Sequence, residues 1–175
     1  MNNDLLLIGI LQFFIVITIS ILVFYLILRI LEKSILKKFE IDINTTAFGI
    51  LAASIIVSTG YMASGITSSI SNTIRLLNND KIMSFETIFE TSQYTMMYLV
   101  MALAASHIVI WSSLKVFTVL TTKIDEFAEI KKNNLSIAFI SSAIIIAVSF
   151  MAKDSIDLLI ESMVPYPQLN VPTNL

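Results

Sequence analysis

The sequence contains no cysteine, one histidine, four glycines and three prolines. Without cysteine the chain forms no disulfide and offers neither a thiolate nucleophile nor cysteine metal ligands. A lone histidine cannot build a metal site by itself. Charge is scarce too, because 14% of the residues are charged, against about 25% in an average soluble domain.

Motifs that carry chemistry are also missing. There is no H-E-x-x-H zinc motif, no G-x-S-x-G nucleophile elbow, no phosphate loop and no pair of carboxylates within an apolar segment. No basic patch is large enough for nucleic acid. The sequence therefore predicts a protein that is not an enzyme, uses no cofactor or metal, and does not bind nucleic acid.

Long apolar segments dominate what is present. The hydrophobic fraction is 56% and the mean hydropathy is +0.85. Four blocks contain no Asp, Glu, Lys or Arg: Leu5–Leu28, Ile43–Ile74, Thr91–Leu114 and Asn133–Ala152. Each has the length of about 20 residues that a helix needs to cross a bilayer, whereas a soluble bundle would place polar residues on every helix turn. We expect an all-α integral membrane protein with four transmembrane helices surrounded by lipid.

Basic residues are segregated along the chain. Four lie between Arg29 and Lys38, and another four between Lys115 and Lys132. The positive-inside rule places such short loops in the cytoplasm. Both termini are then expected outside the cytoplasm, in a multi-pass protein of the bacterial inner membrane.

The chain also repeats itself. Residues 39–64 align without a gap with residues 128–153, at an offset of 89 positions. The shared E-I-x-x-N pattern before each apolar block is the most specific part of the match. Identical pairs are Glu40/Glu129, Ile41/Ile130, Asn44/Asn133, Ile55/Ile144, Ile56/Ile145, Met62/Met151 and Ala63/Ala152. The repeat predicts two parallel helical hairpins that enter the membrane from the same side.

The expected organisation follows from these blocks. Residues 1–70 form the first hairpin, with spans at about 5–28 and 47–70, and residues 91–152 form the second, with spans at about 91–114 and 134–152. Residues 71–90 connect the hairpins on the outer side. Residues 153–175 form an outer tail that begins as an amphipathic helix and ends in a segment broken by proline.

Small residues mark faces where helices can approach closely. In the second span Gly49 and Ala53 are four residues apart, as are Gly60 and Ser64, and the fourth span offers Ala138 and Ser142. Such pairs allow close backbone contact in lipid. The sequence leaves open whether they pack within one monomer, between subunits or along a pore.

Two polar side chains inside the apolar blocks are candidates for a functional role. His107, in the third span, is the only ionisable residue within a span, and Gln12 is a buried polar candidate in the first span. An ionisable residue inside the membrane is a functional candidate by default. A hydrogen bond to a neighbouring helix is the alternative interpretation for both.

The polar residues before the second and fourth spans have a structural interpretation. Asparagine favours helix N-caps, and a carboxylate is stabilised near a helix N-terminus. We expect Glu40, Asn44, Glu129, Asn133 and the adjacent Asn134 to position the two helices rather than to bind a substrate.

The sequence of the second hairpin resembles a known family. The residues Asp125, Glu129, Ile130, Asn134 and Ala138 match the signature of the YjfL-type bacterial inner-membrane proteins, a family of unknown function. Asn133 and Ser136 depart from that signature, and the first hairpin matches it more weakly through Glu40, Ala47 and Gly49. The resemblance covers residues 5–152 and implies a four-span inner-membrane protein without supplying an activity or a ligand.

Two functional hypotheses remain. The first is a non-enzymatic membrane component that self-associates as a homo-oligomer, in a channel-like or envelope-maintenance assembly. The second is a membrane anchor or scaffold that docks a soluble cytoplasmic partner on its charged loops.

Overall fold

The computed structural model describes residues 3–78, 85–120 and 125–166, and most of these residues are helical with no strand among them. The helices are α1 (Asn3–Leu31), α2 (Lys37–Phe39), α3 (Thr46–Ala63), α4 (Ile66–Asn78), α5 (Phe85–Leu120), α6 (Glu126–Lys131) and α7 (Leu135–Glu161), with a π-helical turn at Glu32–Leu36. Four segments are long and apolar enough to cross a membrane: Phe13–Leu31, Thr46–Leu77, Phe89–Val119 and Leu135–Glu161. The predicted all-α, four-span fold is thereby confirmed.

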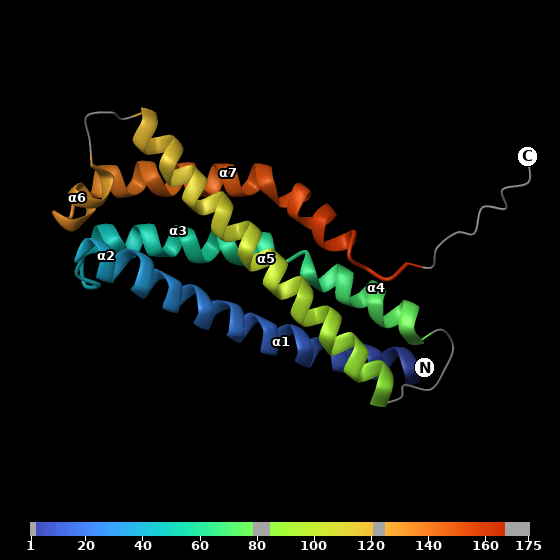
Figure 1. Cartoon of the computed structure of the whole chain (residues 1–175). Helices are drawn as coiled ribbons and strands as arrows, with labels where there is room; N and C mark the ends of the chain where they lie inside the picture. Colours follow the sequence, from blue (N-terminus) through green and yellow to red (C-terminus); the bar gives the residue numbers. More distant parts are fainter. Residues whose placement is uncertain (1–2, 79–84, 121–124, 167–175) are drawn as a thin grey trace, which may run out of the picture.

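The hairpins lie parallel (Figure 1). The short helices α2 and α6 lie at the same end of the bundle, here called the turn end, while α4 and the N-terminus lie at the opposite, far end. From the turn end α3 and α7 run side by side in the same direction and share the most extensive helix contact of the described residues. The long helix α5 runs obliquely across this pair.

The second span is interrupted close to the far end. The helix α3 ends at Ala63, and α4 begins at Ile66 after the pair Ser64–Gly65. A Cβ atom on Gly65 would lie 1.8 Å from Oδ1 of Asp157 in α7. Glycine therefore permits the close approach of α7 at this break, and the predicted span of residues 47–70 passes through it.

Other bounds also differ from those expected. The helix α5 extends beyond the predicted span 91–114 at both ends, and α7 continues to Glu161 through the start of the expected outer tail. Part of the expected outer connection (residues 79–84) and the tail residues 167–175 lie outside the described residues.

The core lies where α3, α5 and α7 meet. Leu51 and Met62 of α3, Tyr98 of α5 and Ile145 of α7 are fully buried. The helix α1 is peripheral, because 17% of its most apolar 18-residue stretch is buried inside the protein, against 44% for the corresponding stretch of the span that contains α3. Among the side chains that the structure describes in α1 and the following turn, the buried ones form one stripe, at Val23, Ile27, Leu31 and Ile35.

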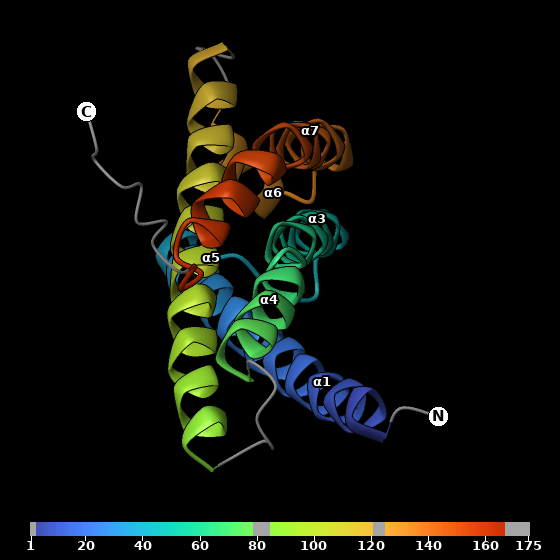
Figure 2. The ribbon, with the colours of Figure 1, turned by 90° about the vertical axis from the view of Figure 1, so that its right-hand side faces the viewer.

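Viewed from its end, the bundle is open on one side (Figure 2). The helix α5 covers one side of the α3–α7 pair, and α1 lies below α3. The opposite side of the pair carries no helix of the described residues. This open face is framed by α7 and α1.

Candidate functional site

The start of α7 is held by its own polar residues. Asn134 is the N-cap, and its side-chain oxygen accepts hydrogen bonds from the backbone N–H groups of Ser136 (3.2 Å) and Ile137 (3.5 Å). Its amide nitrogen donates to Glu129 at 2.8 Å, and Lys132 donates to the other oxygen of that carboxylate at 2.7 Å. The bonds from Lys132 and Asn134 hold the pKa of Glu129 below its ordinary value.

The start of α3 is held from the other hairpin. Its N-cap, Thr45, makes no side-chain capping bond. Instead Oδ1 of Asn133 accepts a hydrogen bond from the backbone N–H of Ala47 at 2.9 Å. Asn133 has a φ of 63°, in the left-handed region that asparagine tolerates better than most residues. The second hairpin therefore caps the central helix of the first.

Two further contacts join the hairpins at the turn end. Lys131 forms a salt bridge with Glu40 at 3.0 Å, and the rings of Phe39 and Phe127 stack with centroids 3.9 Å apart and planes 9° from parallel. We call these four residues, together with Asn133, the turn-end interlock. It connects α2 and the start of α3 to α6.

The asparagines predicted at the helix starts have different roles. The structure places the N-caps one residue later than Asn44 and Asn133, at Thr45 and Asn134. Asn44 lies outside the interlock, because its backbone N–H and side-chain amide both bond to Oδ1 of Asp42, at 2.9 and 3.0 Å. Glu40, Glu129, Asn133 and Asn134 do come together at the turn end.

The predicted small-residue faces fall into two environments. Ala138 and Ser142 are buried, and the hydroxyl of Ser142 donates to the backbone carbonyl of Ile50 at 3.2 Å. Gly49 and Ala53 are exposed instead. A Cβ atom on Gly49 would meet no atom within 4 Å.

Gly60 and Ser64 flank the peripheral helix. Both line a groove of ≈ 200 Å³ between α1 and the α3–α4 segment. A Cβ atom on Gly60 would also meet nothing within 4 Å. Gly60 therefore does not bring two helices of the described chain into close contact.

Three buried hydroxyls were not anticipated from the sequence. Ser58 of α3, Ser106 of α5 and Ser141 of α7 are buried, and none has a hydrogen-bond partner among the described residues. An unsatisfied buried polar group costs about 1–3 kcal/mol, and buried water commonly satisfies such groups. Serines within an apolar run do not reveal which helix face is buried, so no sequence signal distinguished these three.

The intramembrane polar candidates are not joined into one site. His107 is exposed, lies edge-on to Trp111 with ring centroids 6.0 Å apart, and borders a cavity of ≈ 40 Å³ between α1, α3 and α5. Gln12 belongs to α1, but its side chain lies outside the described part of the structure. Within the described residues no group of three or more His, Cys, Asp or Glu side chains could hold a metal ion.

A polar cluster at the far end was also missed. The carboxylate of Glu161 in α7 accepts hydrogen bonds from Ser69 (2.9 Å) and Asn72 (3.0 Å) of α4 and from Tyr166. In the same region Thr73 and the buried Tyr98 share a hydrogen bond of 2.7 Å. These residues come from three helices with no common spacing, so the sequence gave no signal that groups them.

The arrangement identifies the class of protein. Four apolar spans, polar contacts concentrated at the two ends, and a first hairpin capped by the second define a helical multi-pass membrane protein. The chain belongs to the DUF350 family, a domain family of unknown function whose model matches residues 2–156. No curated protein and no solved structure matches it. The expected YjfL-type membership stays a prediction.

Proposed function

We propose that this protein is a non-enzymatic component of the bacterial inner membrane that self-associates through the open face of the α3–α7 pair. Both termini face away from the cytoplasm in this proposal, because the basic residues lie mainly at the turn end. The assembly would serve a channel-like or envelope-maintenance role. The exposure of small residues on the two central helices carries the proposal.

The composition of the open face supports this role. Gly49 and Ala53 of α3 are exposed, and so are Ala143 and Ala147 of α7. Lipid tails do not require small side chains, whereas a second helix does if the two backbones are to approach closely. Four exposed small residues on adjacent central helices therefore favour a protein neighbour.

An aromatic contact between the two central helices also supports the proposal. Phe150 lies two helical turns after Ala143, on the same side of α7. Its ring contacts that of Tyr61 in α3, with centroids 4.6 Å apart. This contact joins the exposed side of α7 that carries Ala143 to the exposed Tyr61 of α3. A second copy meeting this face would contact both hairpins.

Oligomeric state tests the proposal directly. We expect the wild-type protein to form an oligomer in lipid nanodiscs and in native mass spectrometry. Replacing Gly49 by Leu should yield a smaller species whose thermal stability is not lowered, since the new Cβ would meet no atom of a neighbouring helix within 4 Å and leucine has a higher helix propensity than glycine. The matched control is Ala104→Leu, at an exposed position of α5 away from the open face, and it should leave the oligomer intact.

Other outcomes would argue against self-association. A wild-type protein that is monomeric in nanodiscs would overturn the proposal, as would equal effects of Gly49→Leu and Ala104→Leu. Conductance of reconstituted liposomes then separates a channel-like assembly from a structural one. A monomer that co-purifies with a soluble protein through the turn end would favour the anchor hypothesis.

A further inference from the structure

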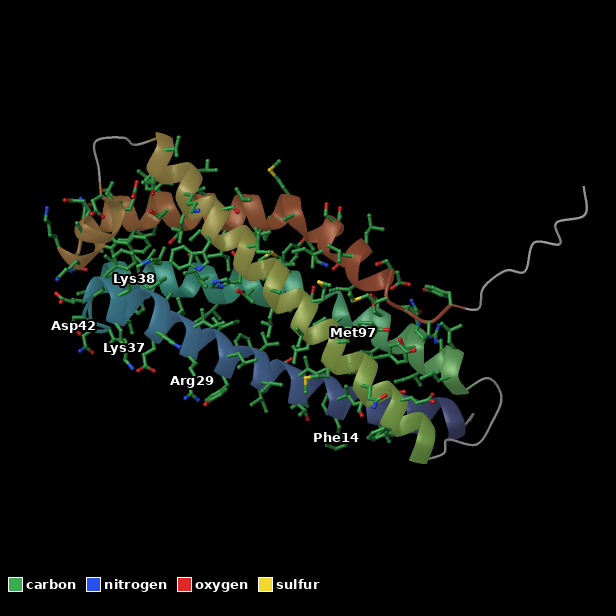
Figure 3. The ribbon with its side chains drawn as sticks, viewed as in Figure 1. Phe14, Arg29, Lys37, Lys38, Asp42 and Met97 are labelled. Atoms are coloured by element: carbon green, nitrogen blue, oxygen red, sulfur yellow. The ribbon has the colours of Figure 1, made fainter. Side chains whose placement is uncertain are left out.

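The first hairpin has a basic groove at the turn end. It has a volume of ≈ 550 Å³ and lies along the end of α1 and the π-helical turn. Its lining consists of Tyr25, Leu28, Arg29, Glu32, Lys33 and Lys37. Figure 3 shows Arg29 and Lys37 on the outward side of this segment, away from α5.

The π-helical turn aligns the basic side chains. Its last hydrogen bond runs from the backbone N–H of Lys37 to the carbonyl of Glu32, five residues earlier. Because a π turn holds more residues than the 3.6 of an α-helix, side chains four apart lie more nearly in line. Arg29, Lys33 and Lys37 follow this spacing. Single π turns are frequent at functional sites.

The charge of the groove is only partly compensated. Glu32 pairs with Lys37 at 3.0 Å, and no carboxylate of the described residues pairs with Arg29 or Lys33. The guanidinium of Arg29 donates to the hydroxyl of Tyr25 and lies 5.8 Å from that ring's centroid. This contact holds the guanidinium in place, while most of its five N–H donors have no hydrogen-bond partner among the described residues. The uncompensated positive charge therefore makes the groove suited to binding an anion.

An apolar surface continues from the groove along the same helix. Leu28 lines the groove and is 56% exposed. Phe24 and Ile21, about one and two helical turns earlier on α1, are 45% and 65% exposed. A small soluble anion would use only the basic part. An amphiphile with a negatively charged head and acyl chains would contact both parts.

From this combination we infer that the groove binds the headgroup of an anionic phospholipid, with Arg29 and Lys33 contacting the phosphate and the acyl chains following α1. Basic pockets at the cytoplasmic membrane surface are suited to anionic lipid headgroups. The predicted orientation places the turn end at that surface. The basic pattern is not repeated in the second hairpin, because the repeat offset puts Thr118 and Glu126 at the positions of Arg29 and Lys37.

Native mass spectrometry of the full-length protein with equal amounts of phosphatidylglycerol and phosphatidylcholine tests the site. We expect phosphatidylglycerol adducts to predominate. The double variant Arg29→Gln/Lys33→Gln should weaken phosphatidylglycerol binding roughly 30-fold, since each basic residue near the membrane surface contributes a factor of about five. Lys33→Gln alone should give about a fivefold loss and keeps the contact between Arg29 and Tyr25.

A charge-matched control and a competitor sharpen the result. Lys115→Gln removes one exposed basic residue of the second hairpin, matches the charge change of Lys33→Gln and should leave phosphatidylglycerol binding unchanged. An equal loss in this control would show diffuse attraction to the basic end and overturn the inference. Displacement of phosphatidylglycerol by excess inorganic phosphate would do the same, because it would identify a soluble-anion site.

Discussion

The second hairpin is self-contained, whereas the first depends on it. Asn134 caps its own helix α7, and Glu129 and Lys132 complete that network within the same hairpin. The helix α3 of the first hairpin receives its side-chain cap from Asn133. Two segments with matching sequence thus have unequal roles, and the α6–α7 junction organises the turn end for both.

Burial shows the same inequality at identical residues. Met62 and Met151 are related by the repeat offset, yet Met62 is 0% exposed and Met151 is 83% exposed. The cause is the packing of the outer helices. The helix α5 crosses both central helices, whereas α1 makes its main helix contact with α3. The open face of the α3–α7 pair is therefore left uncovered.

The repeat pair of methionines gives the largest expected effect. Met62→Ala should lower the free energy of unfolding by about 2–5 kcal/mol, because it leaves a cavity in the core. Met151→Ala should change it by less than about 0.5 kcal/mol, as is usual for surface substitutions. Equilibrium unfolding in mixed micelles measures both. Equal losses would mean that Met151 is buried in an assembly, which would sharpen the self-association proposal.

The borrowed cap comes next in size. Asn133→Ala should cost about 2–3 kcal/mol, because it removes a capping bond worth about 1 kcal/mol and places alanine in a left-handed conformation that costs about 1–2 kcal/mol. Asn133→Gly removes the same bond without the backbone strain and should cost about 1 kcal/mol. Hydrogen exchange should show the loss of protection at the start of α3 in both variants. Loss confined to α7 would contradict a cap shared between the hairpins.

Sequence reasoning succeeded where the bilayer imposes the pattern. A hydrocarbon core requires long apolar helices with satisfied backbones, so the four spans follow from the absence of charge in four blocks. The orientation and the oligomeric state remain predictions.

The site was less predictable because polar contacts depend on which helix faces meet. The small residues Gly49 and Ala138 looked alike in sequence, but the first is exposed and the second buried. Nothing in the sequence indicated that Asn133 would cap α3 rather than its own helix α7. The cluster around Glu161 likewise joins residues about 90 positions apart. Such contacts arise from tertiary packing, which one sequence does not encode in a readable local pattern.

The two N-cap positions offer a smaller, matched comparison. Asn134→Ala should cost about 0.5–2 kcal/mol of stability, since it removes two bonds to the first turn of α7 and one to Glu129. Thr45→Ala, at the equivalent position of the first hairpin, should cost less, because Thr45 caps nothing through its side chain. Thermal unfolding of both variants measures the difference. A larger loss for Thr45→Ala would contradict the conclusion that the second hairpin caps its own helix and the first does not.

The smallest expected effect is the pH dependence of the Glu129 network. In the folded protein, hydrogen bonds from Lys132 and Asn134 lower the pKa of Glu129 below its ordinary value of 4.5. A carboxylate with a depressed folded pKa adds stability that is fully present above its unfolded pKa and is lost as the pH falls through the folded pKa. The contribution should therefore be constant from neutral pH down to about 4.5 and decline below it. Other carboxylates titrate in the same range, so the informative quantity is the difference between wild type and Glu129→Gln. That difference should shrink below pH 4.5, and a difference that stays constant with pH would show that the carboxylate charge contributes nothing to the start of α7.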